Sequence, residues 1–533
     1  MKSLKFFLTA FALLVAQILH SQETPAEKGL KAITPDVLKA QIGFLASDWM
    51  EGRAAGEKGE YLAGDYIASM LQLCGVKPGG DYLRGSDHLN SLVPGGRSYF
   101  QNFILIKTLP GTDPVLSLTS QSGNAVRTTT FSNNVDFSVR PLYRSVEITA
   151  PVIFAGYAFR NEKIKFNDLF KIDVKGKFIM KISGYPAFAE KRLNPSEINA
   201  STASLESYAR ESGAAGIIEF NPSALVTGRP EPKQFMNMSP AEDNQVRSPY
   251  RPRYSLPGNV IPDDLIRITI SAGTADEILK GSGINIEDYI KNADLNQVYQ
   301  IPLLTGKSIS FKSEAVSSQV AVRNIIGEIE GNDPDQKIVI GAHYDHMGMK
   351  DGNIWNGADD NASGTVGALT LAKALTATGI KPGKTIIIAL WSSEEYGLLG
   401  SRYFVRNTPF PLKNIRLNVN LDMISRYISD DNKNGVDMTY STSLPGLKDI
   451  TEANLKKYGI DLAVNYQPSD DPPGGSDHRS FVEAGIPVMR FKPGHREEYH
   501  TPYDEVQKLD WDIMEKIMRI SFANVWELAN RDW

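Results

Sequence analysis

The residues of this 533-residue chain that can do chemistry gather in its last third, where five of the seven histidines fall between positions 343 and 500. Acidic residues lie among them in a fixed order. Histidine nitrogens and carboxylate oxygens are the ligands that zinc takes where no thiolate is offered. The pattern supplies enough ligands for two metals and leaves one glutamate over, which is what a metal-dependent hydrolase needs as a general base. In chain order the candidates are His343, Asp360, Glu394, Glu395, Asp422 and His500.

Each candidate lies close after an apolar segment that predicts a β-strand, or enters a helix from a glycine-flanked loop. The predicted strands span 337–342, 384–391, 415–421 and 486–491. Helical periodicity alternates with them at 362–377, 398–405, 447–458 and 511–530. This alternation predicts a mostly parallel sheet with helices on both faces. Active sites of open α/β sheets form at the carboxyl ends of the strands, so we expect the candidates to converge there.

The spacing suggests how two metals can share these ligands. A single carboxylate, such as that of Asp360, can bridge two cations about 3.5–4 Å apart. His343 and Asp422 can then complete one shell, and Glu395 and His500 the other, with a position on each metal left open.

Two neighbouring residues complete the expected chemistry. Glu394 adjoins a ligand and is placed to take a proton from the attacking water. Asp345 is two residues from His343 and can accept its second ring N–H, which fixes the tautomer. Each candidate alone also has a structural explanation, since two acids suit the start of a helix. Their joint order along the strands favours one site.

Length and composition limit the classes of protein. A chain of this length predicts about two domains. The formal net charge of -5 argues against nucleic acid or an anionic membrane as partner. Cys74 is the only cysteine, so no intramolecular disulfide forms, and the apolar helical pattern around it predicts a buried, inert thiol.

The first 21 residues are typical of a secretory signal peptide. Lys2 and Lys5 precede an apolar stretch at 6–19 that is short for a membrane span. Cleavage is expected near Ser21 or Gln22, and an uncleaved anchor is the alternative. The prediction is export to the periplasm or medium of a bacterium, with no membrane contact after cleavage.

The rest of the chain divides by pattern. Helices are predicted at 35–45 and 57–74, and a loop at 80–100. From 115 to 305, short β-branched and aromatic runs with a helix at 202–212 predict a strand-rich domain, with an irregular excursion at 221–258. This domain holds none of the five late histidines.

Residues 320–510 resemble the co-catalytic dizinc exopeptidases, which include secreted bacterial aminopeptidases and glutamate carboxypeptidase. The resemblance implies an α/β zinc-exopeptidase fold, two zinc ions and peptide substrates. It also implies that Asp360–Asn361 is a cis peptide bond. The matching segments are 341–346, 356–364, 393–401, 420–423, 475–478 and 499–501.

The resemblance implies a role for each residue. Asp360 bridges the zinc ions, Glu394 is the general acid and base, and the Tyr499 hydroxyl steadies the tetrahedral intermediate, although a packed aromatic is the alternative. His478 belongs to a structural loop, and His346 and His495 are expected at the rim. The implied ligands are His343, Asp360 and Asp422 for one zinc, and Asp360, Glu395 and His500 for the other.

The middle region resembles a protease-associated domain of α+β character, through its segments 154–157, 173–177 and 212–216. The peptidase domain is then discontinuous. The expected boundaries are 1–21 for the signal, 22–114 and 306–533 for the peptidase domain, and 115–305 for the insert.

The implied reaction is hydrolysis of N-terminal amino acids from peptides, with two metals and Glu394 activating the attacking water. A carboxypeptidase on the same scaffold is an alternative, with Arg426 as a candidate for binding the terminal carboxylate. Glutaminyl cyclase and a non-catalytic protein built on the inserted domain are further alternatives. The complete ligand set and Glu394 count against the last two.

Overall fold

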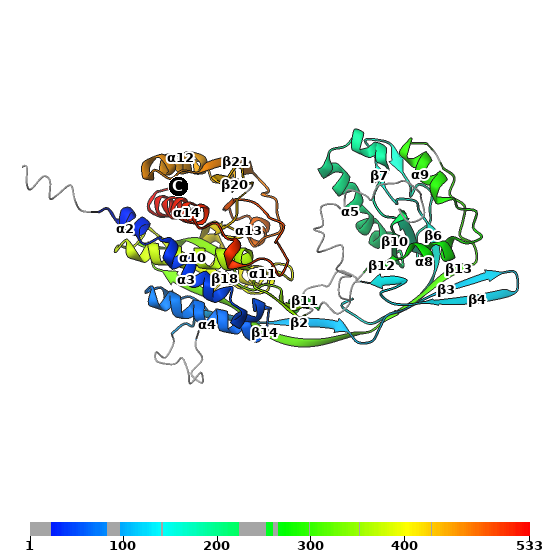
Figure 1. Cartoon of the computed structure of the whole chain (residues 1–533), viewed down its shortest axis with the longest axis horizontal. Coiled ribbons are helices and arrows are strands. Elements are labelled where there is room, and N and C mark those ends of the chain that lie inside the picture. Colours follow the sequence, from blue (N-terminus) through cyan, green and yellow to red (C-terminus); the bar gives the residue numbers. More distant parts are fainter. Residues whose placement is uncertain are drawn as a thin grey trace, which may run out of the picture. The chain divides into compact units, whose positions relative to one another are not determined.

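The computed structural model describes residues 23–82, 96–139, 142–222, 252–258, 265–297, 299–350, 352–427 and 429–533. The predicted signal peptide lies outside the described residues, as do most of the excursion predicted at 221–258 and positions 83–95 of the loop predicted at 80–100. The chain forms two compact units (Figure 1). Unit 1 comprises Met1–Ile104 and Ala321–Trp533, and unit 2 comprises Leu105–Val320.

A long mixed sheet organises unit 1. Its four central strands, β18, β15, β19 and β22, are parallel as predicted, whereas β14 and β20 pair antiparallel to their neighbours. β1 (Lys77–Pro78) pairs with β14 beside this path. From β14 onward, the order across the sheet is β14 (Ala315–Ile329), β18 (Lys384–Trp391), β15 (Asp333–His343), β19 (Ile415–Asn420), β22 (Val488–Lys492), β20 (Gly435–Ser441) and β21 (Ala463–Ser469).

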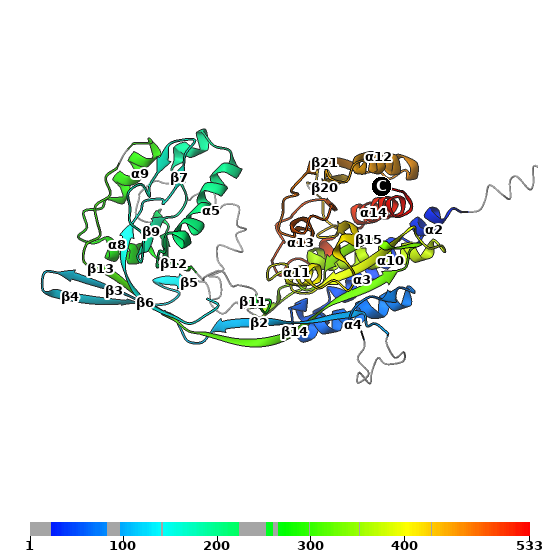
Figure 2. The same ribbon diagram turned by 180° about the vertical axis from the view of Figure 1, so that it is seen from behind.

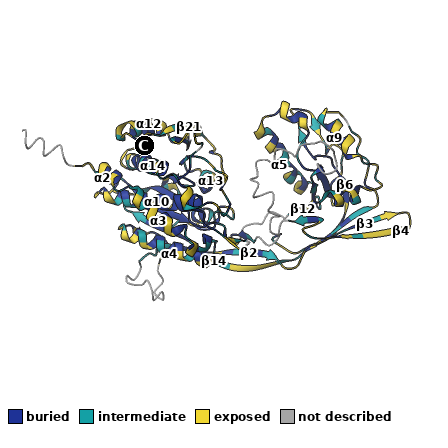
Figure 3. Cartoon of the chain, in the orientation of Figure 1, coloured by how far each residue is buried: buried dark blue, intermediate teal, exposed yellow. Residues whose placement is uncertain are grey.

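The central strands are apolar on both sides because helices cover both faces of the sheet. Ile338 and Ile340 of β15 belong to one buried cluster, whereas Val339 between them belongs to another. β18 alternates in the same way, with Ile386 and Ile387 on opposite faces. Side chains of a strand point alternately to its two faces, so a continuous apolar run is what a doubly covered strand requires. Figure 3 shows this central layer in the colour of buried residues.

One face carries most of the helices. α10 packs against β15, β18, α3 and α14, as the two ribbon views show (Figures 1 and 2). α11 and α13 contribute Phe404 and Phe481 to the cluster on the other face. Among the described residues no helix is long and apolar enough to cross a membrane. The unit 1 helices are α2 (Pro25–Lys31), α3 (Pro35–Leu45), α4 (Lys58–Leu73), α10 (Gly364–Ala377), α11 (Leu399–Arg406), α12 (Leu447–Tyr458), α13 (His478–Glu483) and α14 (Trp511–Asn530).

Cys74 follows α4 and is half-buried against the core, less enclosed than predicted. Burial still raises the pKa of its thiol, which favours the unreactive neutral form.

Unit 2 has a second sheet, in which β6, β9, β10 and β12 are parallel to one another. The chain enters this unit along β2 (Phe100–Pro110) and leaves it along β14. Its helices are α5 (Pro195–Glu211), α8 (Ala272–Leu279) and α9 (Ile286–Asp294). The sheet order is β4 (Ala125–Phe131), β3 (Val115–Ser122), β13 (Lys307–Ser313), β6 (Val146–Phe154), β9 (Phe178–Ile182), β10 (Gly216–Phe220), β12 (Ile266–Ile270) and β5 (Phe137–Val139).

Five further short strands belong to the described residues. β16 (Gly348–Lys350) and β17 (Asn353–Trp355) form a hairpin after β15, and β11 (Arg253–Ser255) pairs with β2. β7 (Arg160–Asn161) and β8 (Phe166–Asn167) form a further two-stranded pair.

Candidate metal centre

The structure brings the candidate ligands together at the carboxyl ends of the central strands. His343 is the last residue of β15, Glu394 lies three residues beyond β18, and Asp422 lies two residues beyond β19. His500 lies in the segment between β22 and α14, and Asp360 in the turn that enters α10. The carboxyl ends of parallel strands lie at a common edge of the sheet, so candidate ligands that are far apart in the sequence lie close together in space.

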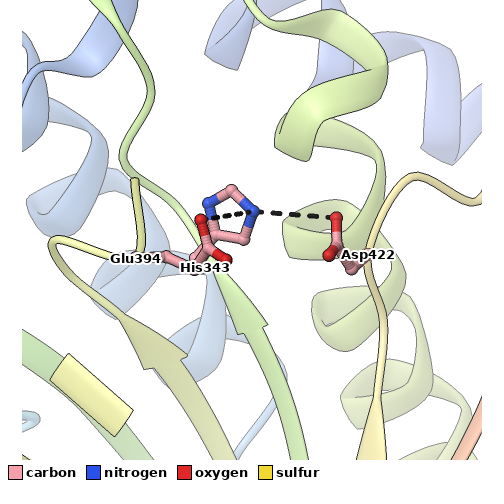
Figure 4. A group of neighbouring side chains, drawn as sticks. All are labelled: His343, Glu394 and Asp422. Carbon is pink, nitrogen blue, oxygen red and sulfur yellow. Dashed lines mark ion pairs between the residues drawn. The ribbon is translucent and has the colours of Figure 1, made fainter. Parts of the chain in front are cut away.

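The first group surrounds the buried ring of His343. Its Nε2 lies 3.3 Å from Asp360 Oδ1, 3.7 Å from Asp422 Oδ1 and 3.8 Å from Glu394 Oε2. Figure 4 shows Glu394 and Asp422 on either side of this ring. One nitrogen facing three carboxylates, with little water access, is the donor set of a divalent cation site.

The second group lies on the other oxygen of the same aspartate. His500 Nε2 is 3.1 Å from both Asp360 Oδ2 and Glu395 Oε2. The two oxygens of Asp360 therefore face different histidines, His343 and His500. This is the arrangement that a bridging carboxylate requires.

His346 was expected at the rim, and this expectation was wrong. Its ring is fully buried, and its Nδ1 lies 2.8 Å from Glu395 Oε1. It also forms a possible three-ligand group with Asp360 and Glu395, although its Nε2 is buried without a partner. The sequence spacing between His343 and His346 does not predict this contact, because tertiary packing determines the direction of the His346 side chain.

A network of hydrogen bonds holds the bridging aspartate in place. The Asp504 carboxylate accepts the backbone N–H groups of Asp359 and Asp360, both at 2.9 Å. Asn361 donates to the carbonyl of Leu421 and accepts the N–H of Met423, which joins this turn to the loop that carries Asp422. The peptide bond Asp360–Asn361 is cis, as the resemblance implied.

Asp345 organises the neighbouring loop. Its carboxylate accepts the backbone N–H of Glu394 at 3.0 Å and of Glu395 at 3.4 Å. The Nδ1 of His343 lies 3.2 Å from the Asp345 carbonyl oxygen and 3.7 Å from its Oδ1. The Asp345 carbonyl oxygen is therefore the closer partner of the His343 ring. The Asp345 carboxylate mainly accepts hydrogen bonds from the backbone of Glu394 and Glu395.

A buried arginine, Arg53, holds the backbone next to the candidate ligands. Arg53 is only 1% exposed and donates hydrogen bonds to four backbone carbonyl groups. Two of these precede the turn that carries Asp360, so the guanidinium anchors that turn to the N-terminal part of unit 1. Burial lowers the pKa of Arg53 to about 10, so it remains a cation at neutral pH. The acceptors are Leu45, Tyr344, Asn356 and Gly357.

Three non-glycine residues next to or within the ligand set have left-handed backbone conformations. They are Ser393 (φ 60°), Met423 (φ 54°) and His500 (φ 53°). Such conformations cost of order 1–3 kcal/mol each and persist where the surrounding structure enforces them. Ser393 and Met423 lie directly beside Glu394 and Asp422, just beyond the ends of β18 and β19.

The charges of the site call for cations. Asp360, Glu394, Glu395 and Asp422 are carboxylates whose side chains are at most 13% exposed. Burial alone raises the pKa of Asp422, but hydrogen bonding to His343 and the charge of Lys492 hold it below its usual range. Burial alone likewise lowers the pKa of His500, and Glu395 and Asp360 outweigh that effect and raise it to about 10. The donor set therefore fits two divalent ions, which would take the place of protons on the histidines.

A cavity of about 220 Å³ opens beside these groups and is lined in part by Tyr499. The Tyr499 ring stacks on that of His500 at 3.8 Å between centroids and is 37% exposed. Burial, then the nearby carboxylates, raises the pKa of Tyr499, so its hydroxyl stays protonated and can donate a hydrogen bond. The cavity also contains two basic residues that the sequence reasoning missed, Arg490 and Lys492.

The remaining sequence candidates do not belong to the two ligand groups. His478 is buried, with its Nε2 3.2 Å from the carbonyl oxygen of Pro473, and takes no part in the ligand groups. His495 lines the cavity and packs edge-on against Tyr499. Arg426, the candidate for a terminal carboxylate, pairs with Glu498 at 3.3 Å. Its charge is thus already matched within the fold.

Comparison with known proteins places this arrangement in context. The sequence model of Peptidase family M28 matches residues 324–525. A probable leucine aminopeptidase 2 of Trichophyton verrucosum is 32% identical over 167 residues, which cover 31% of this chain and 32% of that protein. Leupeptin-inactivating enzyme 1 of Streptomyces exfoliatus is 31% identical over 178 residues, 32% of this chain and 36% of that one. The chain thus matches about a third of the length of these curated relatives.

Solved structures extend the likeness over nearly the whole chain. An aminopeptidase from Aneurinibacillus sp. strain AM-1 has a TM-score of 0.54 at 18% identity, covering 95% of this chain and 97% of that one. BSAP, a zinc aminopeptidase from Bacillus subtilis, has a TM-score of 0.50 at 19% identity, covering 94% and 96%. At these identities the likeness concerns the fold. The chain therefore has the α/β fold of these aminopeptidases, and its segment 324–525, which contains every candidate ligand, is similar to Peptidase family M28.

Proposed function

We propose that this chain is a zinc-dependent aminopeptidase that hydrolyses the N-terminal peptide bond of peptides. The observation that carries the proposal is the position of Asp360, whose two oxygens face His343 and His500 respectively. Glu394 Oε2 lies beside the first of these histidines, 3.8 Å from His343 Nε2. The match of 324–525 to Peptidase family M28 and the names of the curated relatives support the same activity.

Each residue has a role in this proposal. His343, Asp360 and Asp422 would hold one zinc ion, and Asp360, Glu395 and His500 the other. When bound, the metals supply Lewis acidity and lower the pKa of water. Glu394 takes the proton of the attacking water and returns it to the leaving amine.

Two further residues position these groups. Asp345 holds the backbone of both glutamates and, through its carbonyl oxygen, the ring of His343. Tyr499 offers a hydroxyl at the edge of the cavity to the oxygen that gains charge in the transition state.

The proposal includes export and an inserted domain. Residues 1–21 would act as a signal peptide, and N-terminal sequencing of the mature protein would locate the cleavage site. The insert predicted at 115–305, between peptidase segments 22–114 and 306–533, would be a protease-associated domain. The division of the chain at Leu105–Val320 supports an insert in this region.

The decisive experiment compares matched dipeptides and tripeptides with free, N-acetylated or C-amidated ends, before and after chelation and zinc restoration. Loss of hydrolysis on N-acetylation but not on C-amidation, with recovery on adding zinc, is the expected result. The opposite dependence on the ends would establish a carboxypeptidase. Metal binding without cleavage of any substrate would contradict peptidase activity and favour a cyclase or a binding protein.

A further inference from the structure

Two basic side chains, Arg490 and Lys492, line the same cavity as His343, Asp360 and Asp422. They occupy alternate positions at the end of β22, so their side chains leave the strand on one face. Met489 and Phe491, on the opposite face, are buried in the core. The strand therefore directs both cations to one side of the sheet, and the cavity places them beside the candidate metal ligands.

Arg490 is held in a defined position. Its Nη2 donates to the carbonyl oxygen of Pro473 at 3.0 Å. A Cβ at Gly474 would lie 3.0 Å from both Nη1 and Nη2, so the guanidinium rests directly on the glycine backbone. The Nε is buried without a hydrogen-bond partner. The arginine is thus anchored through Nη2 beside Gly474, while its side chain lines the cavity.

Neither cation has a counter-ion in direct contact. Among the described residues neither Arg490 nor Lys492 forms an ion pair with a carboxylate, and Lys492 Nζ lies 3.8 Å from the Met423 sulfur. Burial lowers the pKa of Arg490, and the charges of Asp422 and Asp437 oppose that effect. Asp437 is opposite Lys492 in the β20–β22 ladder but accepts a hydrogen bond from Asn465.

The proposed metals would offset the carboxylates that face them, Asp422 among them. Arg490 and Lys492 then lose Asp422 as a partner charge, and Asp437 lies opposite Lys492 in the ladder. A partly desolvated cation without a partner is unfavourable, and a ligand carboxylate relieves it through charge-assisted hydrogen bonds.

We propose that Arg490 and Lys492 form a subsite for a carboxylate group of the peptide substrate. This inference rests on the proposed peptidase function and specifies its substrates. The carboxylate has two sources, the side chain of an N-terminal glutamate or aspartate, or the terminal carboxylate of a dipeptide. Both put a negative charge within a residue or so of the reacting bond, where the cavity lies.

The experiment separates the two sources by substrate. Glutamyl and glutaminyl p-nitroanilides differ only in the side-chain charge and have no terminal carboxylate. Leu-Gly and Leu-Gly-amide differ only at the terminal carboxylate. Values of kcat/KM are measured for wild type, Arg490→Gln and Lys492→Gln. Lys381→Gln, which removes an exposed lysine paired with Glu330 near the amino end of β18, is the matched control.

We expect the charged member of at least one pair to be favoured at least tenfold in wild type. That ratio should fall about tenfold or more in each cavity variant, chiefly through KM, and stay unchanged in the control. The pair that responds identifies the source. Equal rates within both pairs in wild type, or ratios that survive in both variants, would overturn the subsite. A lysine or arginine that only steadies Asp422 would alter both members of a pair alike and leave the ratio unchanged.

A binding measurement keeps this test independent of turnover. Calorimetry of the zinc-loaded protein under non-turnover conditions compares the binding of L-glutamate with that of L-glutamine. It also compares the binding of Leu-Gly with that of Leu-Gly-amide. If the wild-type protein binds the acid in preference to the amide and Lys492→Gln does not, the subsite is supported. This holds even if no peptide is cleaved, and only the proposed peptidase function is then contradicted. Hydrolysis without any preference in rate or binding leaves the function and rejects the subsite. Arg490→Lys, which retains the charge, should recover part of the preference and controls for misfolding of Arg490→Gln.

Discussion

Glu394 and Glu395 are adjacent in the chain, yet their surroundings drive their protonation in opposite directions. Burial, reinforced by Asp477 and only partly relieved by His343, raises the pKa of Glu394 well above its usual range. Burial alone would do the same to Glu395, but His500 and His346 hold its pKa well below. Two carboxyl groups whose pKa values are shifted in opposite directions can take different roles in one site, one as an anion and the other as a proton carrier. Glu395 is suited to remain an anionic ligand, and Glu394 to carry a proton.

Glu394→Gln tests this division. The amide keeps the shape of the side chain but cannot accept a proton from water, so kcat should fall by roughly 10²–10⁴-fold. The zinc content, measured by atomic absorption, should remain that of wild type, because Glu394 is not a ligand in this proposal. Hydrolysis at the wild-type rate would contradict the assignment, and loss of zinc would make Glu394 a ligand instead.

The two histidines beside Glu395 offer a second test. His500→Ala should reduce the bound zinc from two ions to one per chain, because its Nε2 faces both Asp360 and Glu395. His346→Ala should retain two ions but weaken zinc affinity by about 10–100-fold, as expected for a residue that orients a ligand. Stoichiometry from metal analysis after dialysis against graded chelator distinguishes these outcomes. The reverse pattern would make His346 the ligand.

The sequence predicted that the candidate ligands would lie together, because most of them follow the end of a strand or a glycine-flanked loop and the topology of the sheet brings those ends to one edge. Arg490 and His346 escaped prediction for a physical reason. Arg490 lies within an apolar strand whose register is visible only when the core side, Met489 and Phe491, is known. The turn of His346 toward Glu395 depends on contacts from segments distant in the chain.

At the level of elements, Arg53 joins the segment after α3 to the loop that enters α10. Arg53→Met removes donors from four backbone carbonyl groups in a buried region, each costing about 1–3 kcal/mol when left unsatisfied. We expect the free energy of unfolding to fall by roughly 3 kcal/mol or more. Urea unfolding of the metal-free protein measures it. An exposed counterpart such as Arg416→Met should change stability by less than about 0.5 kcal/mol.

The contact between α4 and the end of β18 predicts a pH dependence. Burial, together with the Asp345 carboxylate, raises the pKa of Glu60 from its ordinary 4.5 to about 8. The folded state therefore binds a proton that the unfolded state releases, and stability from this group is lost as pH rises from about 4.5 to about 8. Glu60 accepts the Gly56 N–H and the Ser392 hydroxyl, which a glutamine can also satisfy in part.

Glu60→Gln should remove this titration. The difference in unfolding free energy between variant and wild type, from urea titrations of the metal-free protein, should grow in favour of glutamine between pH 5 and pH 8. A difference that stays constant over this range would show that Glu60 has an ordinary pKa in the folded protein.

Several elements match their predicted bounds, among them β18, α3, α12 and α14, because their apolar period is unbroken and their ends carry turn residues. Others differ where context overrides pattern. β6 is one strand of nine residues, where the sequence predicted shorter runs, and Pro151 lies within it opposite Ser308. α5 begins at Pro195 behind an Asn194 cap, earlier than predicted, because its first turns are polar and have weak periodicity. β20 and β21, at the edge of the sheet, were not predicted.

At the scale of the whole molecule, every candidate ligand belongs to unit 1, so metal binding is predicted to stabilise the units unequally. Binding to the folded state alone adds about 2.7 kcal/mol at a free metal concentration one hundred times the Kd. Chelation should therefore lower amide protection in unit 1 and leave that of Leu105–Val320 unchanged, as measured by hydrogen exchange with mass spectrometry. An equal loss in both units would show that they unfold as one cooperative body.

The division of the chain also sets an order for its synthesis. The polypeptide emerges from the ribosome amino end first, and domains generally fold as units as they emerge. Unit 2 is one continuous stretch that is finished by Val320, before the first candidate ligand, His343, has been made. Unit 1 needs His500 and then α14 (Trp511–Asn530) before its core can close. The candidate metal centre therefore assembles only after the whole of unit 2 has been synthesised, and a nascent chain that stops before His500 lacks it.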